Sequence, residues 1–233
     1  MMRSPPGLIP QSGMKKYVLI RAREDLTRKA FSDYWSGPHA RLLSGLPEFW
    51  VYATRYLQNH VADDPCFPNP RGWAGVVENW QSDAIHEGRS FASEPVYGQV
   101  VTPDERNFLQ PDHSIALVAA SRVVVDGPAS GLKLIEPYRT ATTMDREAGL
   151  SQWRDSRVGA LRRSGKLYGG STCFIENRVR AGSACTLEGM PAANSYDAIG
   201  EYWFESRLAA EAFAGAAGAS ELLSVSVIEI PRS

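Results

Sequence analysis

The feature that most constrains this chain is an internal repeat, because a unit that recurs is expected to fold in a similar way each time. Short segments rich in Val, Ile, Leu and Tyr, each bounded by turn residues, are predicted strands. In the first half they cover residues 16–22, 51–61, 72–80 and 114–125. In the second half they cover residues 132–138, 167–179, 196–204 and 222–230. Helical stretches separate them at the same places, so the order β-α-β-β-α-β occurs twice.

Local matches between the halves support the repeat. The run Gln58-Asn59-His60-Val61 corresponds to Glu176-Asn177-Arg178-Val179, and Glu78-Asn79-Trp80 corresponds to Glu201-Tyr202-Trp203. The first helix carries apolar residues at helical spacing. We expect Gly37-Pro38 to kink this helix, because a proline has no backbone N–H and crowds the preceding turn.

The repeated order is that of a ferredoxin-like unit, a four-stranded antiparallel sheet with both helices on one face. The other face must also be buried, and two units in one chain can bury these faces against each other. The predicted fold class is α+β, with two tandem ferredoxin-like units packed sheet to sheet as an α+β barrel and a pocket between the sheets. We assign residues 1–13 to a flexible lead-in, 14–125 to the first unit, 126–131 to a linker and 132–233 to the second unit.

Composition agrees with two ordinary globular units. The 233 residues are 43% hydrophobic and 22% charged, and the net charge of −1 comes without the basic patch that nucleic-acid binding requires. No apolar run approaches the roughly 20 residues of a membrane span, and the N-terminus lacks the apolar segment of a signal peptide. Three scattered cysteines give no disulfide framework, so we expect a cytoplasmic protein that binds neither nucleic acid nor membrane.

No cofactor and no metal are expected. The four histidines show no ExxH or HxH spacing of the kind that holds a metal. The chain also lacks a GxGxxG motif between a strand and a helix, and it lacks GxxxxGK, so no cradle for a nucleotide cofactor is visible. The expected partner is a small-molecule substrate. A homodimer is an option that the internal barrel does not require.

Two motifs in the first half resemble the EthD family of dimeric α/β-barrel proteins. In that family an aromatic pair ending in Trp precedes a His by four residues, which is the spacing from Trp35 to His39. A later strand ends in a Gln-Asn-His-Val-like run, which residues 58–61 match, and Glu78 and Trp80 fit the third strand of the family. The resemblance extends over both repeats, with its specific motifs in the first. One departure is that the family usually places Gly-Pro after the His, whereas here the pair precedes it.

The second half lacks the histidines of the first. Val158 and Arg178 stand where the first half has His39 and His60, so we expect the titrating groups of the pocket to come mainly from the first unit. The resemblance implies chemistry without a cofactor on aromatic or polyketide-like molecules. Related barrels include dehydratases, lyases, isomerases and cofactor-independent monooxygenases.

Strand alternation predicts which side chains face the pocket. Successive side chains of a strand point to opposite faces, so Tyr52, Tyr56 and His60 share one face of their segment. A carboxylate beneath apolar helices is costly without a partner. We therefore expect the faces that carry Glu78 and Glu201 to line the pocket between the sheets, and we place the face of Tyr52, Tyr56 and His60 there as well.

His39 is the leading candidate for catalysis. It lies one helical turn beyond Trp35, on the side that should approach the sheet, and an imidazole with an ordinary pKa near 6.5 can transfer protons at neutral pH. His60 or Glu78 would be the second proton-handling group. The alternative is a structural His39 that hydrogen-bonds the backbone beyond Pro38.

The predicted substrate-binding residues are Trp35, Tyr52, Tyr56, Trp80, Arg139 and Glu201. Aromatic rings would stack on a flat ligand, tyrosine hydroxyls would orient it, and Arg139 would bind a carboxylate with two N–H groups. The leading hypothesis is a lyase of the dehydratase type that uses His39 as general base or acid. The alternatives are a cofactor-independent monooxygenase or isomerase in the same pocket, and a non-catalytic protein that binds a small ligand.

Overall fold

The computed structural model describes residues 13–82, 89–168, 173–192 and 195–232. The predicted lead-in, apart from residue 13, and His86 lie outside the described residues. In the first unit the elements are β1 (Gly13–Ile20), α1 (Arg28–Tyr34), η1 (Trp35–His39), α2 (Ala40–Ser44), α3 (Phe49–Tyr52), β2 (Ala53–Val61), β3 (Gly75–Gln81), η3 (Phe91–Ser93), η4 (Tyr97–Val101), α4 (Thr102–Glu105) and β4 (Ile115–Val125). In the second unit they are β5 (Leu132–Tyr138), α5 (Arg146–Tyr168), β6 (Cys173–Val179), β7 (Cys185–Thr186), β8 (Ala198–Phe204), α6 (Arg207–Ala217) and β9 (Leu223–Ile230).

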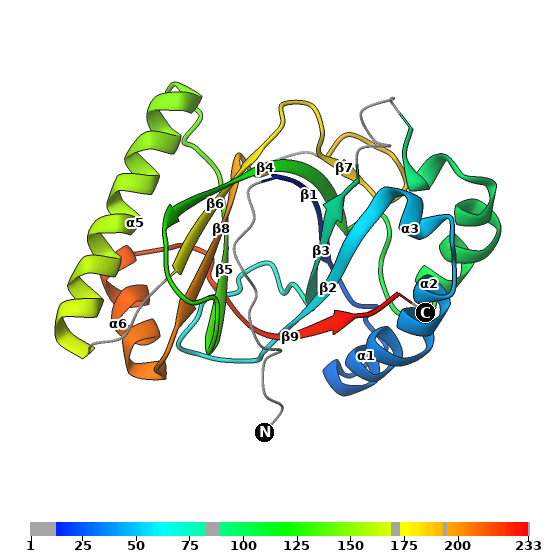
Figure 1. Ribbon diagram of the computed structural model, residues 1–233, viewed down its shortest axis with the longest axis horizontal. Helices are drawn as coiled ribbons and strands as arrows, with labels where there is room; N and C mark the ends of the chain where they lie inside the picture. Colours follow the sequence, from blue (N-terminus) through cyan, green and yellow to red (C-terminus); the bar gives the residue numbers. More distant parts are fainter. Residues whose placement is uncertain (1–12, 83–88, 169–172, 193–194, 233) are drawn as a thin grey trace.

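Eight antiparallel strands close into a barrel in the order β1, β3, β2, β9, β5, β8, β6 and β4, with β4 pairing back to β1 (Figure 1). The sheet of the first unit has the order β4-β1-β3-β2 and that of the second has β9-β5-β8-β6, which is the ferredoxin-like order in both cases. The two sheets also join at their edges, where β2 pairs with β9 and β4 pairs with β6. The predicted fold class is confirmed.

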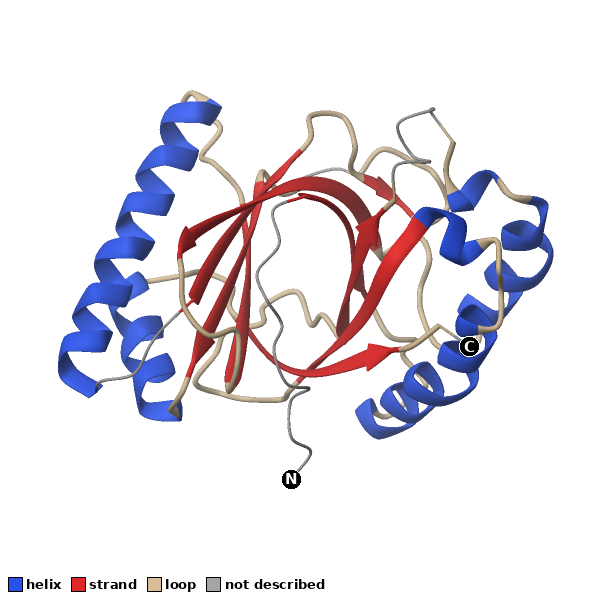
Figure 2. Cartoon of the chain, viewed as in Figure 1, coloured by secondary structure: helices blue, strands red, loops and turns tan. Residues whose placement is uncertain are grey.

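Helices cover the outside of the barrel on two opposite sides (Figure 2). Those of the first unit pack on the outer face of its sheet around Phe31, Trp35 and Phe108. Those of the second unit, α5 and α6, pack on the other sheet around Trp153 and Phe213. None of the helices in the described part of the chain combines the length and the apolar composition of a membrane-spanning segment.

The first helix changes its winding at Pro38, as predicted. Thr27 caps α1 by accepting a hydrogen bond from the Ala30 backbone N–H. Residues Trp35–His39 then form a π-helical turn with Pro38 inside it, before α2 resumes the α-helical winding. Because Pro38 has no N–H to donate to the carbonyl four residues earlier, a wider turn costs less there than in an uninterrupted helix. The wider turn places His39 as a buried residue against the sheet.

Buried charged side chains lie inside the barrel. Lys15 lies 3.3 Å from Glu78 and 2.6 Å from Glu201, while Lys133 lies 3.0 Å from Glu201 and also contacts Glu78. All four side chains are fully or almost fully buried. Burial alone would raise the pKa of Glu201, but Lys133 and Lys15 hold it well below its ordinary value. The four residues form one neutral cluster that joins the two units, which we call the barrel network.

The cavity described next does not lie in the predicted place between the sheets. Apolar side chains from both units, including Leu19, Val76, Leu117 and Ile199, pack around the barrel network. The prediction that Glu78 and Glu201 face the space between the sheets is correct. What that prediction missed is that Lys15 and Lys133 occupy the same space.

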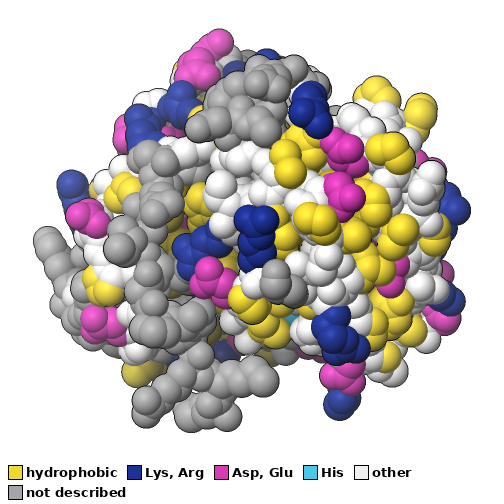
Figure 3. Space-filling view, turned by 45° about the vertical axis from the view of Figure 1, so that its right-hand side comes forward, with side chains coloured by type: hydrophobic (Ala, Val, Ile, Leu, Met, Phe, Trp, Pro, Cys, Tyr) yellow, Lys and Arg dark blue, Asp and Glu magenta, His cyan; other side chains and the backbone are white. Residues whose placement is uncertain are grey.

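The surface over the first unit is rich in apolar side chains. Figure 3 shows hydrophobic side chains gathered over the part of the molecule formed by the helices of the first unit. Two of the exposed large apolar residues, Val51 and Val100, belong to α3 and η4 of that layer. These elements form one wall of the cavity described next.

Candidate active site

The candidate site is a cavity between the helices of the first unit and the outer face of its sheet. Its volume is about 60 Å³. The apolar part of its wall includes Trp35, Leu43, Phe49, Phe91, Phe108 and Leu109. The polar side chains in its wall are Lys16, His39, Tyr56, Asn79, Tyr97 and Glu105. A small apolar cavity with several converging polar groups is typical of a ligand site.

The key pair in this cavity is His39 and Asp104. The Nδ1 atom of His39 lies 2.6 Å from Oδ2 of Asp104, and Tyr34 donates a hydrogen bond of 2.8 Å to the other carboxylate oxygen. Burial opposes ionisation of Asp104, but the hydrogen bonds from His39 and Tyr34 hold its pKa below the ordinary value. An ionised carboxylate accepts a hydrogen bond from Nδ1–H, so Nε2 is the nitrogen left to exchange a proton.

The orientation of His39 is fixed on a second side by Phe108, whose ring centroid lies 4.8 Å from that of the imidazole. His39 lines the cavity whereas Asp104 does not, so the carboxylate holds the imidazole from behind. His39 is 4% exposed. A histidine held by a carboxylate behind it and open to an apolar cavity in front is the arrangement that general-base catalysis requires.

Glu105 follows Asp104 in α4, and its pKa is shifted in the opposite direction. Burial raises the pKa of Glu105, although His39, Lys16 and the Tyr97 hydroxyl oppose that shift. The Tyr97 hydroxyl donates to both carboxylate oxygens at 3.2 and 3.1 Å. Two adjacent carboxyl groups therefore have pKa values shifted in opposite directions, so Glu105 retains a proton to higher pH than Asp104 does.

Lys16 and Asn79 form the sheet side of the cavity. They are paired residues on the neighbouring strands β1 and β3. Burial lowers the pKa of Lys16, against the attraction of Glu105. The side-chain oxygen of Asn79 is buried and has no hydrogen-bond partner among the described residues. This wall offers both a donor and an unused acceptor beside the cavity.

Tyr56 completes the polar wall from β2. Its hydroxyl oxygen accepts a hydrogen bond of 3.0 Å from the Gln58 amide, which leaves the hydroxyl proton available to a ligand. Burial raises the pKa of Tyr56, with the hydrogen bond from Gln58 opposing the shift. The tyrosine is therefore a neutral donor at physiological pH.

His60 lies behind the cavity and does not line it. Its ring packs on Trp35 with a centroid distance of 4.5 Å, and its Nδ1 lies 2.8 Å from the Ser32 hydroxyl. Burial lowers the pKa of His60 to about 4. The residue is therefore neutral at physiological pH, and it supports the Trp35 ring from the back.

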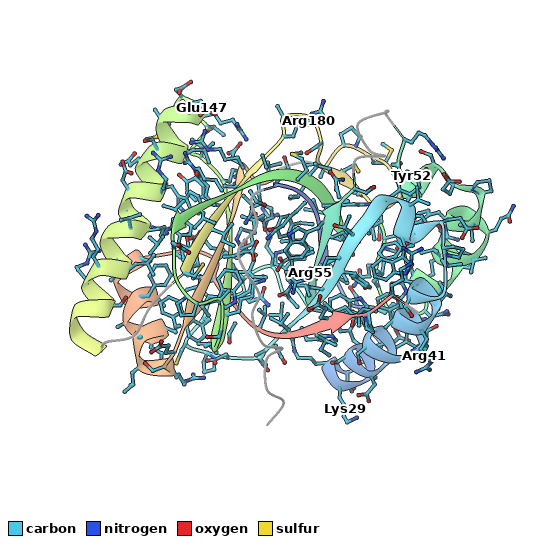
Figure 4. The ribbon with its side chains drawn as sticks, in the orientation of Figure 1. Lys29, Arg41, Tyr52, Arg55, Glu147 and Arg180 are labelled. Carbon is cyan, nitrogen blue, oxygen red and sulfur yellow. The ribbon has the colours of Figure 1, made fainter. Side chains whose placement is uncertain are left out.

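The two faces of β2 are arranged differently from the prediction. Tyr56 and His60 face the helices, whereas Asn59, on the alternate face, hydrogen-bonds Glu78 inside the barrel. Placing the Tyr56 and His60 face between the sheets was wrong, because the first unit buries polar groups on both faces of its sheet. Tyr52 is not in the strand at all. It ends α3, and its hydroxyl donates a hydrogen bond to Glu94 at the edge of the molecule (Figure 4).

The remaining predicted residues lie elsewhere. The ring of Trp80 lies 4.3 Å from Lys15 of the barrel network and 5.0 Å from Arg55, which Figure 4 labels. Glu78 and Glu201 belong to the barrel network. Arg139 lines a separate cavity in the second unit. Of the residues predicted from the sequence, the cavity of the first unit brings together Trp35, His39 and Tyr56.

Between the second sheet and its helices, aromatic rings stack in pairs. Tyr138 stacks on Trp153 at 4.9 Å, and Phe174 stacks on Tyr202 at 4.7 Å. Val158 packs against this aromatic core, and Arg178 forms ion pairs with Glu176 and Glu147.

Five polar residues of the site were missed from the sequence. Lys16, Asn79, Tyr97 and Glu105 line the cavity, and Asp104 holds His39 from behind. Asp104 and Glu105 follow Pro103 at the start of a short helix, where acidic residues are common because they interact favourably with the helix dipole. Their position in the sequence therefore did not mark them as site residues. A search for a carboxylate partner of His39 on a neighbouring helical element could have found them.

One comparison with known proteins concerns the first unit. Residues 23–112 match the family model of the EthD domain, so the resemblance predicted from the sequence is confirmed for the first unit. No curated protein matches the sequence.

Solved structures share the fold of the whole chain. An anthrone oxidase-like protein is 9% identical with a TM-score of 0.52, covering 94% of this chain and 93% of that one. A candidate chlorite dismutase is 7% identical with a TM-score of 0.50, covering 94% and 96%. Chlorite dismutase from Candidatus Nitrospira defluvii in complex with imidazole is 10% identical with a TM-score of 0.48, covering 91% and 90%. At these identities the likeness concerns the fold alone.

Proposed function

We propose that this chain, whose residues 23–112 match the EthD domain, is an enzyme that transfers protons on a small organic molecule bound in the cavity of the first unit. The observation that carries the proposal is the His39–Asp104 pair, held at 2.6 Å with the imidazole lining an otherwise largely apolar cavity. A solvated surface histidine would need no such support. The proposed reaction class is elimination of water, as in a dehydratase.

The proposed roles follow from the positions of the groups. His39 Nε2 removes a proton from the carbon next to a carbonyl group, and the electron pair of that C–H bond forms the new double bond. Glu105 gives its proton to the departing hydroxyl, which leaves as water after its C–O bond breaks. Tyr56 donates a hydrogen bond to the carbonyl oxygen, on which negative charge develops. The reaction is balanced without a cofactor.

Trp35, Phe91 and Phe108 would hold the apolar part of the substrate. A benzene-sized ligand needs a cavity of about 150 Å³, which exceeds the roughly 60 Å³ found here. An aromatic substrate therefore requires some side chains to move. Phe91 and Tyr97 are only half-buried and belong to the short elements η3 and η4, so they are the proposed moving part of the wall.

A cofactor-independent monooxygenase is the second candidate. The same base could remove a proton from a phenol or an anthrone and leave an electron-rich anion that reacts with O2. The solved anthrone oxidase-like protein favours this candidate only to the extent that it shares the fold. An isomerase would use the same two proton transfers on one carbon skeleton. A non-catalytic binding protein would use the cavity without His39 acting on the ligand.

The test is a comparison of variants on a panel of β-hydroxy ketones, from the acetaldehyde aldol to the aldol of benzaldehyde and acetone, with anthrone as the probe for oxygenation. Dehydration is followed by the absorbance of the conjugated product, and oxygenation by O2 consumption. We expect His39→Gln to lower turnover by about 100- to 10,000-fold while the melting temperature changes little. The control is His113→Gln, since the His113 side chain is 61% exposed and does not line the cavity.

The outcomes separate the candidates. Dehydration that depends on His39 supports the lyase, and O2 consumption that depends on His39 supports the monooxygenase. Turnover that His39→Gln leaves unchanged contradicts both. Saturable binding of panel members without any turnover would support a non-catalytic binding protein.

A further inference from the structure

A second cavity lies on the helix side of the second sheet, and both units contribute to it. Its volume is about 360 Å³. The second unit supplies Glu136, Tyr138, Arg139, Arg157, Tyr196 and Glu221, and the first unit supplies Pro70 and Arg71. This volume is several times that of the first cavity and is large enough for a ring-sized organic molecule.

The loop that follows β2 is held against the second unit, so its contribution to the second cavity is fixed by the fold. Phe67 packs in the apolar core of the second unit, and the Pro68 carbonyl accepts a hydrogen bond of 2.7 Å from the Leu222 backbone N–H. The Trp73 indole N–H donates to the Tyr196 hydroxyl at 3.2 Å. These contacts hold Arg71 beside the second unit, where its guanidinium lies 4.9 Å from the Tyr196 ring.

Two buried charged side chains in the wall of the second cavity, Arg157 and Glu136, form an ion pair. Arg157 donates to Glu136 through Nε at 3.1 and 3.0 Å and through Nη2 at 2.6 Å. The Tyr202 hydroxyl donates to the same carboxylate at 2.7 Å. Since Glu136 is thus neutralised by Arg157, the charge offered to a ligand comes from the other lining residues.

The other charged residues of the wall are two arginines and one glutamate. Arg71, Arg139 and Glu221 line the cavity beside the Arg157–Glu136 pair. Glu221 is 5% exposed, and burial raises its pKa, against hydrogen bonds from Tyr196 and Trp73 and the attraction of Arg71. The wall therefore presents two guanidinium groups to a ligand. Both arginines also interact with other protein groups, but a guanidinium has five N–H donors and can serve several partners at once.

We infer that the second cavity binds a small organic acid, whose carboxylate is held by Arg139 and Arg71 and whose apolar part lies against Tyr138, Tyr196 and Pro70. Planar guanidiniums match the geometry of a carboxylate, which distinguishes this site from the cavity around His39, whose wall contains no arginine among the described residues. The site is independent of the proposed reaction, because no residue lines both cavities.

Benzoate is the probe, benzamide is its neutral isostere and inorganic phosphate is the anion without an apolar part. Binding is measured by titration calorimetry on the full chain, and the fold of each variant is checked by its melting temperature. We expect benzoate to bind with a dissociation constant of about 1 mM or lower, and benzamide and phosphate to bind at least about 10-fold more weakly. Arg139→Gln should weaken benzoate binding by about 10-fold or more, and Arg139→Lys should restore it only in part.

The matched control is His39→Gln, which alters the first cavity only. Loss of benzoate binding in His39→Gln with retention in Arg139→Gln would place the acid in the first cavity and overturn the inference. Equal binding of benzoate and benzamide would overturn it, as would phosphate binding as tightly as benzoate. Absence of measurable binding of benzoate up to about 10 mM would overturn it as well.

Discussion

At the scale of single residues, the behaviour of His39 depends on Asp104. The carboxylate lies behind the imidazole and does not line the cavity, so it acts on a substrate only through His39. It selects the tautomer in which Nε2 is free and stabilises the imidazolium that forms when His39 takes a proton. Asp104 is therefore a positioning residue.

Asp104→Asn should lower turnover by about 100-fold or more, because an amide no longer stabilises the imidazolium and can favour the other tautomer. The dependence of turnover on pH should change with it, which a merely structural role would not cause. The measurement is the pH profile of kcat/KM on the substrate found with the panel. The matched control is Asp112→Asn, since Asp112 pairs with His113 at 2.9 Å on the surface. Similar profiles for the wild type and Asp104→Asn would contradict the assignment.

His60 gives a second prediction, on stability. Its pKa is about 4 in the folded protein because of burial, against about 6.5 in an unfolded chain. Between these values the unfolded state binds a proton that the folded state does not, so the contribution of His60 to stability is present above pH 6.5 and is lost as the pH falls towards 4. The full effect is at most about 3 kcal/mol.

The test for His60 is the free energy of unfolding at pH 7 and pH 5 for the wild type and His60→Gln. Other groups also titrate in this range, so the comparison is the difference between the two proteins. The variant should lose less stability than the wild type over that interval. An identical loss in both proteins would mean that His60 titrates normally in the fold.

At the scale of elements, the cavity of the first unit depends on a close approach of α1 and η1 to β3. A Cβ atom added at Gly75 would lie 2.4 Å from the Trp35 ring, so only glycine lets the indole lie flat on the strand. Gly75→Ala should cost about 1 to 3 kcal/mol of folding free energy through overpacking, and it should displace the ring that forms one wall of the cavity. Denaturant unfolding measures the first effect, and the fluorescence of Trp35 in ligand titrations reports the second.

Gly215→Ala is the control for this substitution, because Gly215 lies in α6 and an added Cβ would meet nothing within 4 Å. That change should leave stability unchanged or raise it by up to about 1 kcal/mol, as expected for alanine in a helix. If the two substitutions had the same effect, the contact between Trp35 and Gly75 would not be a constraint.

The helices and strands also show which parts of the fold could be predicted from the sequence. The strand order and the interruption at Pro38 depend on local patterns, and both are present in the structure. Tyr52 was misplaced because α3 ends only at Tyr52 and the pairing of β2 with β3 is irregular between Ala53 and Arg55, which local alternation cannot reveal. Asp104 was missed because its partner lies far away along the chain, on a different element.

At the scale of the whole molecule, the barrel network joins the two units. Asn59 donates to Glu78 and Asn177 donates to Glu201, each at 2.9 Å, so the two units make equivalent contributions. The glutamates could be placed inside the barrel from the sequence because each belongs to a repeated motif. The lysines could not, since their role depends on the closure of the barrel. Each lysine contacts glutamates from both units.

The barrel network predicts that the effects of two substitutions on stability are not additive, which a count of ion pairs would not predict. Glu78→Gln would leave two buried lysines with one carboxylate, and the loss of a partner from a buried ionic cluster costs about 3 to 5 kcal/mol. Lys133→Met alone should be similarly costly, because it leaves two carboxylates with one lysine. The double variant restores neutrality, so its loss of stability should be smaller than the sum of the two single losses by about 1 to 3 kcal/mol. Urea unfolding of the four proteins gives the coupling energy.

Because the network spans both units, each protein should also unfold in a single transition. Additive losses, or separate transitions for the two units in the wild type, would show that the barrel is held together by its strand pairing and apolar packing and not by the central charges.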